Sequence, residues 1–256
     1  MHGGDICRGW RGTSSGQQVF AKSLGNAPPG LFAAEARGLD LLRVDGGPPI
    51  PELMAASDDG LVLRWVEPGS PSPSVAREFG RRLAVLHTAW LPSFGLADDG
   101  FIGPLPLPNA RAQSWPEFFV ERRIRPYMST LSAAERDAVE QVCARVAELA
   151  GPAEPPARIH GDLWSGNVLW ADSVAWLIDA SSAHGGHRET DLAMLALFGA
   201  PQLAEILAGY EEVAPLADGW RERIPLHQLH PLLVHATLFG GGYGSRAAAA
   251  ARSLLR

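Results

Sequence analysis

Residues 159–167 read IHGDLWSGN, and residues 176–179, WLID, form a short apolar run that ends in an aspartate. The first stretch places Asn167 five positions after Asp162, which is the H-x-D-x-x-x-x-N spacing of a kinase catalytic loop. Phosphoryl transfer needs one carboxylate to orient and deprotonate a hydroxyl, and an amide oxygen with a second carboxylate to hold Mg²⁺. The two stretches therefore predict phosphoryl transfer, with Asp162 as the catalytic base and Asn167 and Asp179 as metal ligands.

Three more side chains near this stretch receive roles from their positions. His160 precedes Asp162 by two residues, and we expect a neutral imidazole that fixes the loop through hydrogen bonds, although the spacing also allows a general base or nucleophile. Trp164 lies between the base and the metal ligand, where a wall of the acceptor site is favoured over buried core. Asp191 opens a predicted helix, so we expect it to accept backbone N–H groups of the catalytic loop or of the helix end.

One lysine stands out in the composition. The chain has 256 residues with 22 Lys plus Arg, and Lys22 is its only lysine. Lys and Arg are interchangeable on a solvated surface but not where a compact ammonium is required. Lys22 lies in a predicted strand, and Glu35 follows one turn into a predicted helix. On spacing alone, a solvated residue or a favourable charge near the helix N-terminus is the favoured interpretation of Glu35. With the kinase motif downstream, we expect Glu35 instead to pair with Lys22 and aim it.

The order of predicted elements favours an α+β fold with two lobes. Pro-rich residues 67–73 form a stiff joint, so we divide the chain into a small β-rich N-terminal lobe, 1–67, and a larger, mainly helical C-terminal lobe, 68–256. The expected strands of the first lobe are 6–10, 17–24, 52–56 and 61–66, with a helix at 31–44. The expected helices of the second lobe are 74–90, 115–128, 131–149, 188–198, 201–212 and 224–255, the last interrupted by Gly240-Gly241-Gly242.

The charge and the composition limit the classes of partner that the protein can bind. A net charge of −6 gives no general attraction to nucleic acid or to an anionic membrane. Two cysteines without CxxC spacing indicate neither a disulfide framework nor a zinc site. We find no apolar run of about 18 residues and no signal-peptide pattern at the N-terminus. We therefore expect a cytoplasmic monomer with no nucleic-acid or membrane partner.

Several of these segments together resemble the fructosamine kinase (ketosamine-3-kinase) family. Trp164, directly after the HGDL run, separates this family from the related aminoglycoside and choline kinases. The resemblance spans nearly the whole chain. Its segments are VFAK at 19–22, EARGL at 35–39, WPEFF at 115–119 with RRI at 122–124, IHGDLWSGN at 159–167, ID at 178–179, GHRETDLAM at 186–194, His235, and FGG at 239–241.

The resemblance implies a protein-kinase-like fold and ATP-dependent, Mg²⁺-dependent phosphorylation of a sugar. In that family the C3 hydroxyl of a ketosamine, formed by glycation of a small amine or a protein lysine, is phosphorylated and the adduct becomes labile, which repairs glycation. Lys22 would hold the α- and β-phosphates and Glu35 would aim it. The implied adenine contacts come from Arg64, Trp65 and Val66, the implied phosphate turn from Gly3, Gly4 and Asp5, and the implied acceptor contacts from Trp164, Glu189 and His235.

Departures from the family pattern keep two alternatives open. Family members usually have a helix and a first strand before the Gly3-Gly4 turn, so we expect the first strand of the small lobe to be missing. Asp179 is followed by Ala180 where the family usually has proline, and Arg64 stands at the joint where acidic or apolar residues are common. One alternative is a kinase for aminoglycosides or choline-type amino alcohols. The other is a truncated, inactive binding protein of kinase fold.

Overall fold

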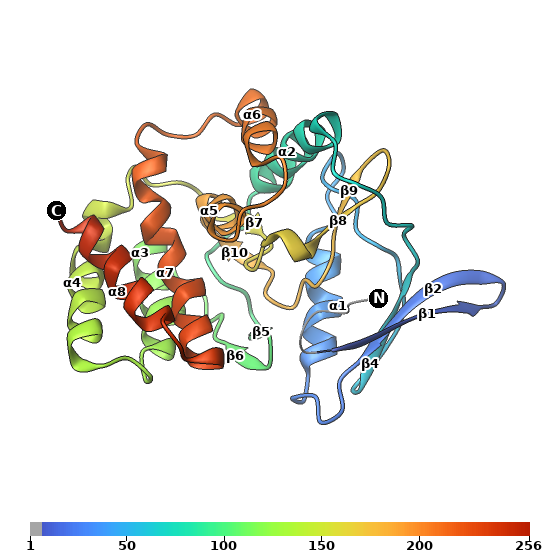
Figure 1. Cartoon of the computed structure of the whole chain (residues 1–256), viewed down its shortest axis with the longest axis horizontal. Coiled ribbons are helices and arrows are strands. Elements are labelled where there is room, and N and C mark those ends of the chain that lie inside the picture. The colour runs from blue at the N-terminus through green and yellow to red at the C-terminus, as the bar shows by residue number, and fades with distance from the viewer. Residues whose placement is uncertain (1–6) are drawn as a thin grey trace.

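The computed structural model describes residues 7–256, and its N-terminal part is an antiparallel sheet with one helix (Figure 1). The four strands lie in the order β1-β2-β4-β3. Their bounds are β1 Arg8–Ser14, β2 Gln17–Ser23, β3 Leu53–Ser57 and β4 Gly60–Arg64. Helix α1, Leu31–Leu41, connects β2 to β3 and packs on the sheet with buried residues that include Phe32 and Leu39. The expected α+β class and the β-rich N-terminal region are confirmed.

The first hairpin is longer than the sequence suggested. We expected a strand at 6–10 and a turn at 12–16, but β1 continues to Ser14 and pairs with β2 along its whole length. Only Ser15 and Gly16 form the turn, and both have positive φ, 50° and 79°. Two central residues of positive φ match the twist of a two-residue hairpin, so Gly12, Thr13 and Ser14 stay in the strand.

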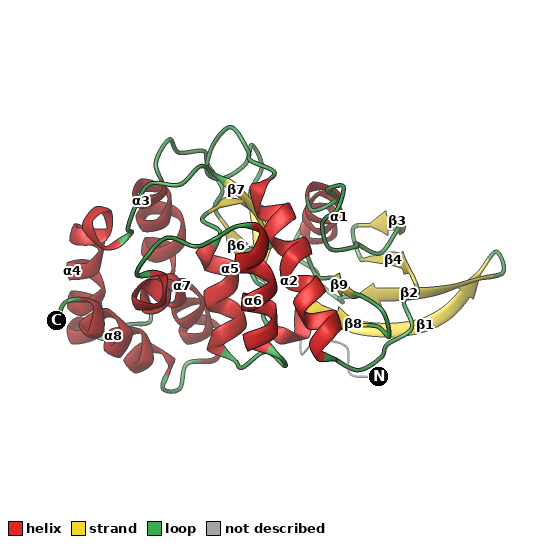
Figure 2. Ribbon diagram, turned by 90° about the horizontal axis from the view of Figure 1, so that it is seen from above, coloured by secondary structure: helices red, strands yellow, loops and turns green. Residues whose placement is uncertain are grey.

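The C-terminal part is mainly helical (Figure 2). Its main helices are α2 Pro73–Thr88, α3 Trp115–Phe118, α4 Ala133–Leu149, α5 Glu189–Leu197, α6 Leu203–Val213, α7 Trp220–Phe239 and α8 Tyr243–Leu254. Helix α2 begins where predicted because the Ser72 side chain accepts the N–H of Val75 and Pro73 occupies the first helical turn. The expected break near Gly240 is confirmed: Gly240 and Gly241 have positive φ between α7 and α8.

One predicted helix is wrong in type. Residues 115–128 are α-helical only to Phe118; a π-helical segment, Phe119–Ile124, and a 3₁₀ turn, Arg125–Tyr127, follow. Pro126 lacks a backbone N–H, so it cannot continue an i→i−4 hydrogen-bond ladder there. The apolar spacing of this segment is helical throughout, which is why the sequence does not separate the three helix types.

Short hairpins and strand pairs carry the catalytic segments. They are β5 Gly100–Ile102 with β6 Leu105–Leu107, β7 Ala157–Ile159 with β10 His184–Gly186, and β8 Val168–Trp170 with β9 Ala175–Leu177. The first of these hairpins lies between α2 and α3.

Two apolar cores support this arrangement. One joins the sheet and α1 to α2, α6 and the β8–β9 hairpin; the other lies among α4, α7, α8 and the segment after α3. The first core connects the two parts of the chain, and the hydrogen bond from Gly69 N–H to the Trp170 carbonyl fixes the joint to the β8–β9 hairpin. The exact boundary at residue 67 stays a prediction. No helix between residues 7 and 256 combines the length and apolarity needed to cross a membrane.

Candidate active site

One cleft of about 980 Å³ brings together most of the predicted site residues from both parts of the chain. Those that line it are Lys22, Glu35, Arg64, Trp65, Val66, Asp162, Trp164, Asn167, Asp179 and His235. Gly3, Gly4 and Asp5, predicted to form the phosphate turn, lie outside the described residues. Glu189 does not line the cleft.

The catalytic loop leaves β7 through a left-handed glycine. Gly161 has a φ of +80°, and a Cβ at this position would lie 2.5 Å from the carbonyl oxygen of Ser182. A side chain would therefore be strained and would also collide with the neighbouring backbone. The glycine allows the chain to turn directly after Ile159 and to place Asp162 in the cleft.

Asp191 holds the start of this loop. Its Oδ2 accepts the backbone N–H of His160 at 2.8 Å and its Oδ1 accepts that of Gly161 at 2.9 Å. Burial would raise the pKa of Asp191, but hydrogen bonds from His87 and from the loop backbone lower it below its ordinary value. The carboxylate is therefore held in its charged form by the donors that it fixes.

Two residues that no sequence pattern indicated lie behind Asp191. His87 of α2 places its Nε2 3.1 Å from Asp191 Oδ2, and its Nδ1 lies 2.9 Å from the hydroxyl of Tyr210 in α6. All three side chains are fully buried. This chain of hydrogen bonds ties the catalytic loop to two helices of the core. His87 and Tyr210 both lie on apolar helix faces, so helical spacing alone predicts that they pack in the core.

His160 joins the two halves of the catalytic centre. Its Nε2 donates to the carbonyl of Ile178 at 2.8 Å, and its Nδ1 accepts the backbone N–H of Asp162 at 3.3 Å. This pairing requires the neutral Nε2–H tautomer. The ring is completely buried and does not line the cleft. The buried ring can support the loop through its hydrogen bonds, but it cannot reach a substrate in the cleft to act as a nucleophile.

Asp162 and Asn167 contact each other across the loop. The Asn167 amide donates to the Asp162 carbonyl at 2.8 Å and faces its Oδ2 at 3.4 Å. The amide nitrogen is thereby committed to the loop, which leaves the Asn167 Oδ1 as a ligand atom. Burial, followed by the carboxylates of Asp179 and Asp191, raises the pKa of Asp162 to about 7, against the opposing hydrogen bond from Asn167. Such a carboxyl can exchange a proton near neutral pH.

Asp179 and Lys22 contact each other directly. Asp179 follows β9 with a φ of 60°, an uncommon backbone conformation for a residue other than glycine and one that concentrates at functional sites. The Lys22 ammonium is buried between Asp179 and Glu35, whose Oε1 lies 2.8 Å away. Burial alone would lower the pKa of Lys22, but the two carboxylates raise it above its ordinary value. The lysine is therefore charged.

The joint between the two parts of the chain presents free backbone groups. Trp65 N–H donates to the Gln18 carbonyl at 3.0 Å, whereas the N–H and C=O of Val66 make no hydrogen bond within residues 7–256. Val66 lines the cleft, so these groups are available to a planar ligand with donors and acceptors. Arg64, which departs from the family pattern, pairs with Glu52 through Nε at 2.7 Å.

Trp164 forms a wall of the cleft. Its ring folds over Gly166, where a Cβ would lie 2.3 Å from the ring carbons. The side chain remains 37% exposed and lines the cleft beside Asp162, so it is not part of the buried core. His235 of α7 lines the same cleft.

Glu189 is committed elsewhere. Arg223 donates to both of its oxygens, at 2.9 and 2.6 Å, and the residue is only 2% exposed. The Nε2 of His227 lies 3.3 Å from the same carboxylate. Glu189, His187 and His227 place possible metal-ligand atoms within 4.8 Å of one another, but the Arg223 guanidinium already neutralises the one carboxylate of that group. Glu189 thus buttresses the fold and does not contact an acceptor.

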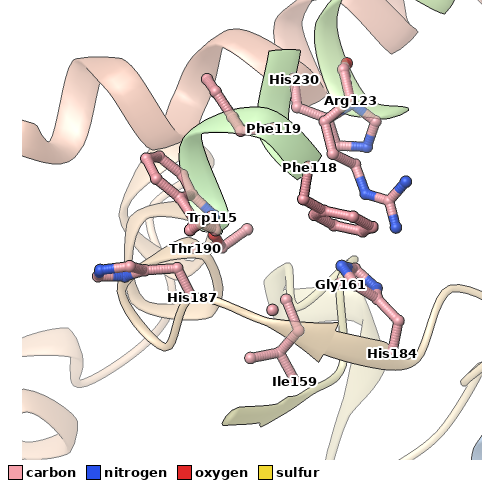
Figure 3. Close-up of a pocket in the computed structure, with 11 residues that line it drawn as sticks. Trp115, Phe118, Phe119, Arg123, Ile159, Gly161, His184, His187, Thr190 and His230 are labelled. Carbon is pink, nitrogen blue, oxygen red and sulfur yellow. The ribbon is translucent and has the colours of Figure 1, made fainter. Parts of the chain in front are cut away.

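The WPEFF segment packs behind the catalytic loop. Figure 3 shows Trp115, Phe118 and Phe119 above Ile159 and His184, around a cavity of about 10 Å³, room for a single water molecule. Arg123, from the arginine cluster of this segment, is buried and donates to the Pro108 carbonyl at 2.6 Å. This segment therefore packs against strands β7 and β10, with the Phe118 ring 5.4 Å from that of His184.

The described side chains fit a magnesium site. Asp179 and the Asn167 amide oxygen offer one charged and one neutral oxygen in the same cleft, and Mg²⁺ prefers few protein ligands of this kind. Lys22 would remain beside them as a cation for phosphate oxygens.

Known proteins resemble this chain over its whole length. A model of the fructosamine kinase family matches residues 1–256. A Thermus thermophilus protein described as a "probable ketoamine kinase" is 39% identical over 248 residues, covering 95% of this chain and 88% of the relative. The crystal structure of a "putative fructosamine-3-kinase" from Thermobifida fusca has a TM-score of 0.93 and 48% identity, covering 100% of this chain and 92% of that one.

A more distant structure shows the fold. Aminoglycoside phosphotransferase APH(4)-Ia has a TM-score of 0.66 at 18% identity, covering 99% of this chain and 92% of that one. The two-lobed architecture expected from the order of elements and the protein-kinase-like fold implied by the family resemblance are thereby confirmed. The chain belongs to the fructosamine kinase family and is a phosphotransferase whose acceptor is an alcohol group.

Proposed function

We propose that this enzyme transfers the γ-phosphoryl group of ATP to the C3 hydroxyl of a ketosamine, on a small amine or a glycated protein lysine. The observation that carries the proposal is the meeting of Lys22, Asp162, Asn167 and Asp179 in one cleft, within a chain of the fructosamine kinase family. These four side chains supply the positions that phosphoryl transfer needs. Phosphorylation at C3 would make the adduct labile and so remove glycation.

Each residue has a defined task in this proposal. The free backbone groups of Val66 bind the adenine edge, and Lys22, aimed by Glu35, binds the phosphates. Asn167 and Asp179 would hold Mg²⁺, which when bound neutralises charge on the phosphates. Lys22 contacts Asp179 in the structure. When the phosphates and the metal bind, part of this contact must be replaced by contacts of Lys22 with the phosphates and of Asp179 with the metal.

Asp162 orients the acceptor hydroxyl in line with the phosphorus and accepts its proton. Its raised pKa brings the carboxyl close to the pH at which it can do so. His160 and Asp191 act through the backbone: they fix the loop that carries Asp162. Trp164 stands beside the base as a wall for the sugar. The Nδ1 of His235 donates to the Pro231 carbonyl, and its Nε2, which has no hydrogen-bond partner within residues 7–256, can accept a hydrogen bond from the acceptor.

An acceptor panel tests the proposal. Consumption of ATP would be followed with fructosyl-lysine, ribulosyl-lysine, a glycated peptide and two aminoglycosides, with and without Mg²⁺, and phosphorus–carbon coupling in NMR spectra would locate the phosphate on the sugar. We expect turnover of ketosamines with the phosphate at C3, and none with Asp162→Asn, which should still bind nucleotide. Turnover confined to aminoglycosides, or phosphate on another hydroxyl, would contradict the proposal. Asp137→Asn, on the exposed face of α4, is the matched control.

A further inference from the structure

The end of the cleft beside α7 and α8 is aromatic. His235 is surrounded by Phe198, Phe239 and Tyr243, with ring centroids 5.1, 5.5 and 5.1 Å from its own. All four line the cleft that contains Asp162. We call these four residues the aromatic end. Phe239 is 57% exposed, so the aromatic end presents apolar surface that the protein itself does not cover.

Negative charge is confined to the other end of the cleft. The acidic residues that line it are Glu35, Asp162 and Asp179, and all three belong to the catalytic centre. Among residues 7–256, no carboxylate lines the aromatic end. A site built for a polycation would place carboxylates there.

A positive charge lies next to the aromatic end. The guanidinium of Arg246 lies 5.3 Å from the centre of the Tyr243 ring, is exposed, and has no carboxylate within ion-pair distance in the described part of the chain. Burial, together with this guanidinium, lowers the pKa of His235 despite its hydrogen bond to Pro231, so the imidazole is neutral. Arg246 therefore places a positive charge beside the Tyr243 ring, where it repels a cationic group that aromatic rings alone would attract and attracts a carboxylate.

We propose that the aromatic end binds the amine-derived part of the acceptor and selects ketosamines of apolar α-amino acids that carry a free carboxylate. The inference rests on the proposed function and specifies its substrate class. With the sugar hydroxyl at Asp162, the carrier extends along the same cleft toward α7 and α8. An apolar or aromatic side chain covers Phe239 and Tyr243, while the carboxylate faces Arg246. Apolar cover and charge complementarity are thus both satisfied by one carrier.

Three adducts of fructose separate these two contributions. The phenylalanine adduct has the ring and the carboxylate, the phenylalaninamide adduct keeps the ring without the carboxylate, and the glycine adduct keeps the carboxylate without the ring. We expect kcat/KM for the phenylalanine adduct to exceed that for the glycine adduct by at least about tenfold, as filling an apolar pocket does. It should exceed that for the amide by about two- to fivefold, the scale of an exposed ion pair.

Two variants assign the preference to residues. Phe239→Ala should lower the phenylalanine-to-glycine ratio of kcat/KM several-fold, and Arg246→Gln should bring the acid-to-amide ratio close to one. Trp90→Ala is the control, because Trp90 is an exposed tryptophan, 45% accessible, at the end of α2 and outside the cleft. It should leave both ratios unchanged. Thermal melting would show that all three variants fold.

The outcomes separate the inference from the proposed function. Equal kcat/KM values for all three adducts, or ratios that survive both substitutions, overturn the inference and leave the ketosamine kinase standing. A higher rate with fructosyl-lysine than with the phenylalanine adduct overturns it as well. Failure of every ketosamine as an acceptor overturns the proposed function and the inference with it.

Discussion

Gly38 of α1 lies directly against the backbone of Ala180: a Cβ at position 38 would lie 1.8 Å from the Ala180 carbonyl oxygen. Gly38 is one turn after Glu35, and Ala180 immediately follows Asp179. The closeness of these two backbones therefore fixes the separation between the helix that carries Glu35 and the strand end that carries Asp179. Lys22 occupies the space between the two carboxylates.

Gly38→Ala should disrupt this geometry. Replacing glycine with alanine normally stabilises an α-helix by up to about 1 kcal/mol. At this position the added methyl group must push α1 away from Ala180. We expect a loss of stability of about 1–3 kcal/mol, as for an overpacked site. Misplacement of the Lys22 partners should lower kcat/KM on the order of 10²-fold.

Denaturant unfolding and steady-state assays check this expectation. Gly25→Ala is the control, because no atom of residues 7–256 lies within 4 Å of a Cβ at position 25. A Gly38→Ala protein as active as the wild type would show that the α1–Ala180 contact does not set the catalytic geometry.

Lys22→Arg should remove most activity although it preserves charge. The buried ammonium lies between Glu35 and Asp179, where a planar guanidinium is too wide and directs its donors differently. We expect a drop in kcat of about 10²-fold, the scale of losing one charge-stabilising donor. Turnover and nucleotide binding would be measured side by side. Arg145→Lys, at an exposed position of α4, should behave as the wild type; a fully active Lys22→Arg variant would make the single lysine a coincidence of composition.

Local sequence patterns predicted the parts of the site that are contiguous. The H-x-D-x-x-x-x-N run and the strand ending in Asp179 could be identified because each side chain is placed by its immediate neighbours. Lys22 and Glu35 were connected only through chemistry, since an isolated lysine needs a carboxylate, and the structure places them 2.8 Å apart. Patterning also predicted most helices, because apolar spacing reports the buried face directly.

Contacts between distant segments could not be predicted in this way. His87 and Tyr210 are 123 positions apart, and nothing near either one signals that they meet behind Asp191. Glu189 was expected at the acceptor because the family resemblance implied it, but the direction of its side chain is set by Arg223, 34 residues later. A charged residue in the first turn of a helix can face a ligand or a buried partner, and only the tertiary structure decides between them.

Asp191→Asn should destabilise the catalytic loop more than its conservative size suggests. Both Asp191 oxygens accept hydrogen bonds, from the backbone of His160 and Gly161 and from His87. An asparagine must turn its NH₂ group toward one of these donors, which leaves a buried donor without an acceptor. We expect a loss of about 1–3 kcal/mol in the free energy of unfolding.

The readouts for Asp191→Asn distinguish positioning from substrate contact. The variant should lower kcat more than it raises KM, because Asp191 is buried and does not line the cleft. Asp40→Asn is the control, because Asp40 is an exposed residue of α1; this variant should change neither the free energy of unfolding nor kcat. An Asp191→Asn protein with unchanged stability and kcat would contradict the positioning role.

The pKa of Asp162 predicts two linked pH dependences. The carboxyl must be ionised to accept a proton, so kcat/KM of the free enzyme should fall as pH decreases through about 7.

The free energy of unfolding should show the opposite dependence and fall as pH rises. Because folding raises this pKa from 3.8 to about 7, the contribution of Asp162 is fully present below pH 3.8, is lost as pH rises to about 7, and is constant above it. Asp162→Asn cannot ionise and escapes this loss, so its Tm should exceed that of the wild type by an amount that grows between pH 4 and 7 and then levels off. Melting curves without nucleotide or Mg²⁺ across this range would measure the difference, with Asp137→Asn expected to follow the wild type throughout. A constant Tm difference, together with a rate that does not change near neutral pH, would show that Asp162 is not the group that titrates.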